Sequence, residues 1–199
     1  MGASWLPIVV IALLAAAIVW IFSRYNGLVR SKKRVEEAWS GIDVQLRRRA
    51  SLIPNVTEIV KAFAEHERDV FGEVARARGA LQQAGSAGQA ADANNRVTQA
   101  LSRLFAVVEN YPQLRSSETM MGLRADLADV EEKIAFARQF YNRNVLDYNT
   151  RLDTYPDAII ANNSNFEPEE FFEADAEGRA EVRVVLTRHR EQPIAPPAA

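Results

Sequence analysis

The 199-residue chain contains no cysteine and only two histidines, His66 and His189. The absence of cysteine excludes disulfides, thiolate nucleophiles and thiolate metal sites, and it fits a reducing compartment. The residue three positions before each histidine is apolar (Phe63 and Leu186), so the Glu-x-x-His pairs of di-iron helical bundles are missing. A serine or threonine nucleophile also lacks a base, and no glycine-rich phosphate loop occurs. We expect no enzyme activity, no metal and no cofactor.

A strong excess of charge of either sign is also missing. The 24 basic and 26 acidic residues leave a formal net charge of −2. Binding to nucleic acid depends on neutralising many phosphates, so this balance disfavours nucleic acid as a partner. Hydrophobic residues make up 48% of the chain, which is ordinary for a folded protein, so most of the chain is expected to pack. The length suits one soluble domain with an anchor.

The first 23 residues carry no charged side chain. The apolar run from Trp5 to Phe22 would be roughly 27 Å long as an α-helix, which is close to the hydrocarbon thickness of a bilayer. Trp5 and Trp20 lie near its two ends, where indole rings favour the membrane interface. A cleaved signal peptide would need basic residues before the run, and none is present. We therefore predict a retained transmembrane anchor over residues 1–23.

Basic residues follow the anchor, and none precedes it. Those that come before the first acid, Glu36, are Arg24, Arg30, Lys32, Lys33 and Arg34. Basic residues next to a transmembrane helix stay on the cytoplasmic side, which predicts a single-pass protein of the cell inner membrane with its N-terminus outside and its bulk in the cytoplasm. The same cluster could bind anionic lipid headgroups. We favour the simpler role in topology, because every inward-facing anchor needs such residues.

After the anchor, apolar residues recur at helical spacings of three and four. The first stripe, which extends the anchor helix into the soluble part, consists of Val35, Trp39, Ile42 and Leu46. A bend is expected at Asn26–Gly27. A turn is expected near Ser51–Pro54, because proline suits the first turn of a new helix and disfavours helical geometry in the residue before it.

Similar stripes predict three further helices, at about 54–83, 92–110 and 117–154. The stretch 84–91 is rich in Gly, Ala, Ser and Gln, and we expect it to be a flexible loop. No segment alternates with period two for long. The expected fold class is all-α, with an N-terminal transmembrane helix followed by an antiparallel up-and-down bundle of about four helices.

The chain is expected to divide after the anchor into a bundle at 24–156, an acidic extension at 157–178 that packs on or near the bundle, and a largely disordered tail at 179–199. Within the extension, residues 167–177 contain six acids and no base, namely Glu167, Glu169, Glu170, Glu173, Asp175 and Glu177. The tail ends in PIAPPAA. A block of one charge sign is typical of a solvated or interacting segment.

Two stretches of the chain resemble the LemA family. The first, Tyr25–Asn55, contains the segments AWSGIDVQL and LIPN, and the second, Glu131–Asn149, reads EEKIAFARQFYNRNVLDYN. Tyr155-Pro156, Phe166 and the pair Phe171–Phe172 extend the resemblance, which covers about residues 5–172. Ser51 departs from the pattern, because the family usually has Asp there. The resemblance implies a single-pass membrane protein with a cytoplasmic antiparallel helical bundle, and it implies no agreed biochemical function.

Polar side chains lie beside the apolar seams. The candidate interaction or structural set is Asp43, Gln45, Arg48, Glu131, Arg138, Asn142 and Asn149. These residues could line a ligand or catalytic pocket, but a polar network that fixes helix register is favoured, with Asp43 paired to Arg138. The basic run at 47–49 is expected to meet an acidic partner, for which the 167–177 block of the same or another chain is a candidate.

The leading functional hypothesis is a membrane-anchored interaction protein, with the lipid bilayer and either other proteins or copies of itself as partners. Phe136 and Phe140 lie off the main seam of their helix and could form a second face against another chain, or could widen the core. The alternatives are a subunit of a membrane-associated enzyme and a lipid-binding or membrane-shaping module.

Overall fold

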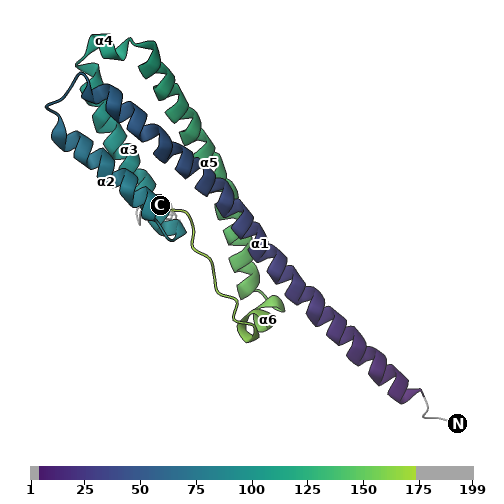
Figure 1. Ribbon diagram of the computed structural model, residues 1–199. Helices are drawn as coiled ribbons and strands as arrows, with labels where there is room; N and C mark the ends of the chain where they lie inside the picture. The colour runs from purple at the N-terminus through teal and green to yellow at the C-terminus, as the bar shows by residue number, and fades with distance from the viewer. Residues whose placement is uncertain (1–4, 174–199) are drawn as a thin grey trace, which may run out of the picture.

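The computed structural model describes residues 5–173, in which all regular structure is helical, so the expected all-α class is confirmed. The helices are α1 (Leu6–Lys61), α2 (Arg68–Gln83), α3 (Ala87–Glu109), α4 (Pro112–Arg115), α5 (Glu118–Asp153) and α6 (Asp157–Asn163). The last described residues run in extended form from α6 back along the bundle (Figure 1). The tail predicted at 179–199 and the end of the acidic extension lie outside the described residues.

Helix α1 contains 56 residues and belongs to two environments. Its second half packs in the bundle, whereas its first half projects beyond it as a single rod (Figure 1). The apolar window of this projecting half is long enough to cross a membrane, and none of it is buried within the protein. Large apolar side chains exposed along a whole helix are stable in lipid rather than in water. The structure therefore agrees with an N-terminal membrane-spanning helix.

The predicted turn at Ser51–Pro54 is wrong, because α1 runs through Pro54 and ends at Lys61. A proline inside a helix leaves the carbonyl four residues earlier without its partner. Here that carbonyl belongs to Ala50, and Arg78 of α2 donates to it from Nε at 3.0 Å. Ile53 and Val56 on either side of the proline are buried. A contact with another helix thus replaces the missing bond and keeps α1 continuous.

Arg78→Ala is expected to lower the free energy of unfolding by about 2 kcal/mol, because a hydrogen bond from a charged donor is lost. In a Pro54→Ala background the same change is expected to have a smaller effect, because residue 54 then donates to the Ala50 carbonyl itself. Denaturant unfolding of the detergent-solubilised chain, followed by circular dichroism, measures both losses. Equal losses in the two backgrounds would show that Arg78 does not compensate for the proline.

The predicted flexible loop at 84–91 is also largely helical. Helix α3 begins at Ala87, where Ser86 caps it by accepting a hydrogen bond from the Gln89 N–H at 3.4 Å. Ala87, Ala90 and Ala91 are buried. These alanines belong to the hydrophobic core of the bundle, so the segment is part of the core rather than a linker.

The bundle consists of two antiparallel pairs of helices. Helices α1 and α5, which are distant in the sequence, form the longer pair, and α2 and α3 form a shorter hairpin, which covers the half farther from the projecting end (Figure 1). Buried residues from the helices fill the centre, among them Ile42 of α1, Leu104 of α3 and Val130 of α5, each with no exposed surface. The expected up-and-down bundle of about four helices is confirmed. Helix α6 and the extended segment occupy the part of the α1–α5 surface that the shorter hairpin leaves open (Figure 1).

Candidate functional site

An extended segment, residues 165–173, is held against α5 by a repeated pair of side chains; we call this segment the strap. It begins at Asn165, whose φ of 53° reverses the chain after α6. Asparagine tolerates this left-handed backbone better than most residues. On α5, the dipeptide Tyr-Asn occurs at 141–142 and again seven residues later at 148–149. All four of these side chains contact the strap backbone.

The two asparagines each form a closed pair of hydrogen bonds with one strap residue. The Asn149 side chain donates to the Glu169 carbonyl and accepts from the Glu169 N–H, both at 3.0 Å. The Asn142 side chain donates to the Phe172 carbonyl at 3.3 Å and accepts from the Phe172 N–H at 2.9 Å. An amide side chain matches a peptide group in this way because it carries one donor and one acceptor side by side. The recognition is therefore of backbone, independent of strap side chains.

The spacing of the two asparagines explains the fit. Seven residues of α-helix advance about 10.5 Å. Three residues of extended chain advance about 10 Å. Side chains seven apart on α5 therefore reach backbone groups three apart on the strap. The two tyrosines obey the same rule, because the Tyr148 hydroxyl donates to the Glu167 carbonyl at 3.0 Å and the Tyr141 hydroxyl donates to the Glu170 carbonyl at 2.8 Å.

Both tyrosine hydroxyls keep their protons. Burial, reinforced by the neighbouring Glu169 and Glu170 carboxylates, raises the pKa of Tyr141 to about 12. Burial and nearby glutamates also raise the pKa of Tyr148 above its ordinary value. A hydroxyl that must donate to a carbonyl loses that bond when it ionises. The strap is thus held by donors that do not titrate near neutral pH.

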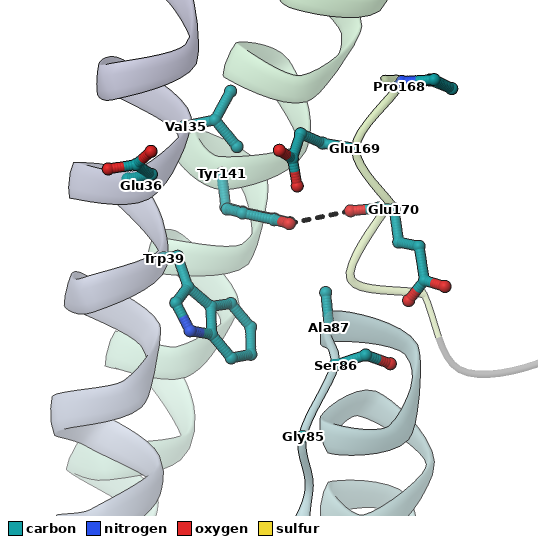
Figure 2. Close-up of a pocket in the computed structure, with 10 residues that line it drawn as sticks. All are labelled: Val35, Glu36, Trp39, Gly85, Ser86, Ala87, Tyr141, Pro168, Glu169 and Glu170. Carbon is teal, nitrogen blue, oxygen red and sulfur yellow. Dashed lines mark hydrogen bonds between the residues drawn. The ribbon is translucent and has the colours of Figure 1, made fainter. Parts of the chain in front are cut away.

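Aromatic packing closes the far end of the strap. Phe172 is only 2% exposed and lies 6.3 Å from the Trp39 ring, which itself lies 5.6 Å from the Tyr141 ring. A cavity of about 320 Å³ separates this cluster from the start of α3. Figure 2 shows Trp39 and Tyr141 pointing into it and Glu169 entering from the strap, with the Tyr141–Glu170 hydrogen bond along one side. The strap therefore forms one wall of the cavity.

A second polar cluster surrounds Arg49, which is 4% exposed. Its guanidinium reaches Asn94 and Thr98 of α3 and lies 2.7 Å from the Glu131 carboxylate of α5. Burial lowers the pKa of Arg49 and Glu131 opposes that shift, but the group stays charged. The arginine thus joins three helices, and sequence reasoning missed both Arg49 and Asn94.

A third cluster lies where the projecting half of α1 leaves the bundle. Arg151 of α5 donates to the Asp157 carboxylate from Nε at 3.0 Å and Nη2 at 2.8 Å, and from Nη1 to the Gly27 carbonyl at 2.8 Å. A Cβ at Gly27 would lie only 2.7 Å from Arg151 Nη2. Helix α1 is unbroken at this glycine. The absence of a side chain at Gly27 allows the Arg151 guanidinium to lie close to the α1 backbone.

The seven predicted polar residues do not form one network. Asn142 and Asn149 hold the strap, and Glu131 pairs with Arg49. The predicted Asp43–Arg138 pair is wrong, because Asp43 pairs with Arg47 of its own helix at 2.9 Å. The remaining members are Arg48, which pairs with Asp129 at 3.2 Å, Gln45, whose side-chain oxygen is buried without a partner, and Arg138, which is exposed.

Within the described part of the chain, the arginines at 47–49 do not contact the acidic residues of the strap. Within residues 5–173 their partners are carboxylates of α1 and α5. The strap is too far toward the anchor to reach them, because Glu169 pairs instead with Lys32 at 3.5 Å. An exposed pair of this kind adds little stability. The position of each basic residue along α1 therefore decides which carboxylates it can reach.

The membrane-flanking residues divide between solvent and the α6 region. Trp5 and Trp20 are exposed, and the Arg24 guanidinium lies 5.5 Å from the Trp20 ring centroid while approaching Asp157 at 3.8 Å. Lys33 pairs with Glu36 at 2.6 Å. Arg30 and Arg34 are exposed. The basic cluster therefore lies beside the apolar span, and two of its members also hold other segments: Arg24 pairs with α6 and Lys32 with the strap.

Comparison with known proteins matches residues 38–185 to the LemA family. Magnetosome protein MamQ of Magnetospirillum gryphiswaldense is 25% identical over 80% of this chain and 68% of its own length. Magnetosome protein MamQ 2 of Paramagnetospirillum magneticum is 24% identical over 87% of this chain and 73% of its own. The family match begins beyond the apolar span and runs past the strap, whereas the resemblance was expected over 5–172. The chain belongs to the LemA family.

Proposed function

We propose that this chain is a single-pass protein of the inner membrane whose bundle lies in the cytoplasm and binds other proteins rather than catalysing a reaction. The apolar half of α1, with basic residues on one side only, supports the anchoring and the orientation. The strap is held by hydrogen bonds from within the chain, and the Arg49 and Arg151 clusters join helices of the bundle to one another. The binding surface is therefore sought among exposed side chains.

The observation that carries the proposal is an exposed apolar face on α5. Phe136 is 73% exposed and Phe140 is 54% exposed. These residues are four apart, so they lie on one side of the helix, nearly opposite the strap side. They border a groove between α1 and α5 that includes Gly41 and Gln45. Two adjacent exposed phenylalanines beside a groove are typical of a surface that a partner covers.

Charge at the rim of this groove indicates the kind of partner. Glu37 and Glu132 line it, both are exposed, and neither has an ion pair within residues 5–173. A second copy anchored in the same membrane would lie at the same height, and a two-fold symmetric contact would bring these carboxylates near their equivalents. A different protein that presents a helix with an apolar ridge and basic flanks fits better. Self-association is the competing outcome.

A photo-crosslinking residue placed at Phe136 is expected to yield an adduct with a second protein in living cells. The matched control, the same probe at exposed Gln82 of α2, is expected to yield none. Adding Phe140→Ser or reversing the charges with Glu37→Lys and Glu132→Lys should reduce the adduct at least fivefold. Surface changes of this kind alter stability by only about 0.5 kcal/mol, so melting should stay nearly unchanged. An adduct of twice the chain mass, insensitive to charge reversal, would contradict the proposed partner.

The orientation is tested with single cysteines, which the native chain lacks. Gln83→Cys, exposed at the end of α2, is expected to resist an impermeant maleimide in intact spheroplasts and to react after lysis. Ser4→Cys, on the other side of the apolar run, is expected to react in both. The physical reason is that the basic flank does not cross the bilayer. Reaction of Gln83→Cys before lysis would place the bundle outside the cytoplasm.

A further inference from the structure

The membrane-facing end of the bundle carries an exposed apolar surface that neither the anchor nor the strap uses. Tyr155, in the turn between α5 and α6, is 77% exposed, and Ile159 of α6 is 55% exposed. The only charged residue within α6 is Asp157, and it is buried and paired with Arg151. The exposed side of this short helix is therefore free of charge.

Contacts with α1 fix the height of α6 relative to the anchor. Asp157 lies 3.8 Å from the Arg24 guanidinium, and Arg151, which holds Asp157, donates to the Gly27 carbonyl at 2.8 Å. The ring of Phe166, just after α6, packs edge-on against Tyr25 at 5.6 Å. All of these partners lie within one turn of α1. Figure 1 shows α6 at the point where the projecting half of α1 leaves the bundle.

That height is the level of the lipid headgroups. The apolar run ends at Phe22, so Arg24 and Gly27 lie about 3 Å and about 7.5 Å beyond it along an α-helix. The polar layer on each side of the hydrocarbon core is about 5–7.5 Å thick. With the anchor in a bilayer, α6 and the turn before it therefore fall inside this layer. Tyrosine favours this layer, and an uncharged apolar side chain reaches the acyl boundary beneath it.

We propose that Tyr155 and Ile159 form a second contact with the membrane, in which α6 lies in the headgroup layer beside the anchor. The partner is the lipid surface itself, at the boundary between headgroups and acyl chains. This contact rests on the anchor described under the proposed function. Two points of attachment restrain the tilt of the bundle, because the chain no longer pivots on α1 alone. The Phe136 face then stays at a fixed height above the bilayer.

Single-cysteine variants of the full chain test the contact in vesicles of phosphatidylcholine and phosphatidylglycerol. A nitrobenzoxadiazole label is placed at Ile159, at Asn162 on the same helix, at Gln113 of the distant α4, and at Val19 in the anchor. Lipids that carry a nitroxide near the headgroup quench labels in the interface. We expect quenching at Ile159 and Asn162 at least threefold greater than at Gln113, and quenching at Asn162 to fall at least twofold on adding Tyr155→Ser and Ile159→Ser.

Each outcome decides one point. Equal quenching at Asn162 and Gln113, with Val19 protected in the acyl region, would overturn the α6 contact and leave the anchor intact. A water-exposed label at Val19 would overturn both the contact and the anchor. Quenching at Asn162 that ignores the Tyr155→Ser and Ile159→Ser changes, in a variant with unchanged helix content, would show that these two side chains do not make the contact.

Discussion

Replacing Asn142 and Asn149 together by alanine is expected to release the strap and to lower the free energy of unfolding by about 4 kcal/mol. Four hydrogen bonds to strap backbone are lost, each worth about 1 kcal/mol. The Glu169 and Phe172 peptide groups would also lose the amides that satisfy them beside α5. Limited proteolysis should cleave within 166–173 in the variant at protease concentrations that leave the native chain intact.

The chain provides a matched control for the strap experiment. Asn144 lies on α5 between the two strap-holding asparagines, and its side chain donates to the Phe140 carbonyl of its own helix at 2.8 Å. Asn144→Ala changes helix propensity by as much as each of the two strap substitutions does, which favours alanine by roughly 0.7 kcal/mol per residue. It should leave the strap protected and the stability unchanged or slightly raised. If Asn142→Ala with Asn149→Ala behaves like Asn144→Ala, the strap is not held by these amides.

The second large effect is expected at the buried arginine. Glu131→Ala should lower the free energy of unfolding by about 3 kcal/mol, the lower end for a broken buried ion pair, because the Glu131 side chain is itself partly exposed. Arg49, which is 4% exposed in the native chain, then has no counter-charge. Denaturant unfolding of the solubilised chain measures the loss. The neighbouring exposed Glu132→Ala is the control and should alter stability by only about 0.5 kcal/mol.

The sign of the coupling between Arg49 and Glu131 distinguishes a buried charge from simple loss of packing. Adding Arg49→Met to Glu131→Ala should recover about 1 kcal/mol or more, because the uncompensated charge is removed and an apolar chain of similar length fills the space. Asn94 loses a partner in the double variant, so recovery is incomplete. A double variant less stable than Glu131→Ala alone would mean that Arg49 contributes through its other contacts rather than through its charge.

The sequence by itself determined the helical class, the span of α5 and the apolar run at the N-terminus. These depend on local properties, namely periodic apolar residues, a capping serine at 117 and an uninterrupted absence of charge. The Tyr-Asn repeat was also visible, and its seven-residue interval places all four side chains on one side of α5. Arg49 occupies a core position of the first stripe, seven residues after Ile42, which was a usable signal for a buried charge.

Only the tertiary structure decided the conformation or role of several residues whose local sequence pattern was misleading or ambiguous. Pro54 would end an isolated helix, but Arg78 from α2 satisfies the carbonyl it frees, so α1 continues. The alanines near residue 90 suggest a linker in the sequence, but the bundle buries them in its core. The role of the α5 asparagines could not be predicted without knowing which backbone segment lies opposite them. No local sequence pattern indicates that the strap runs in extended form along α5. A contact between distant segments changes the free energy of the local conformation in each of them. Local sequence preference contains no information about such a contact.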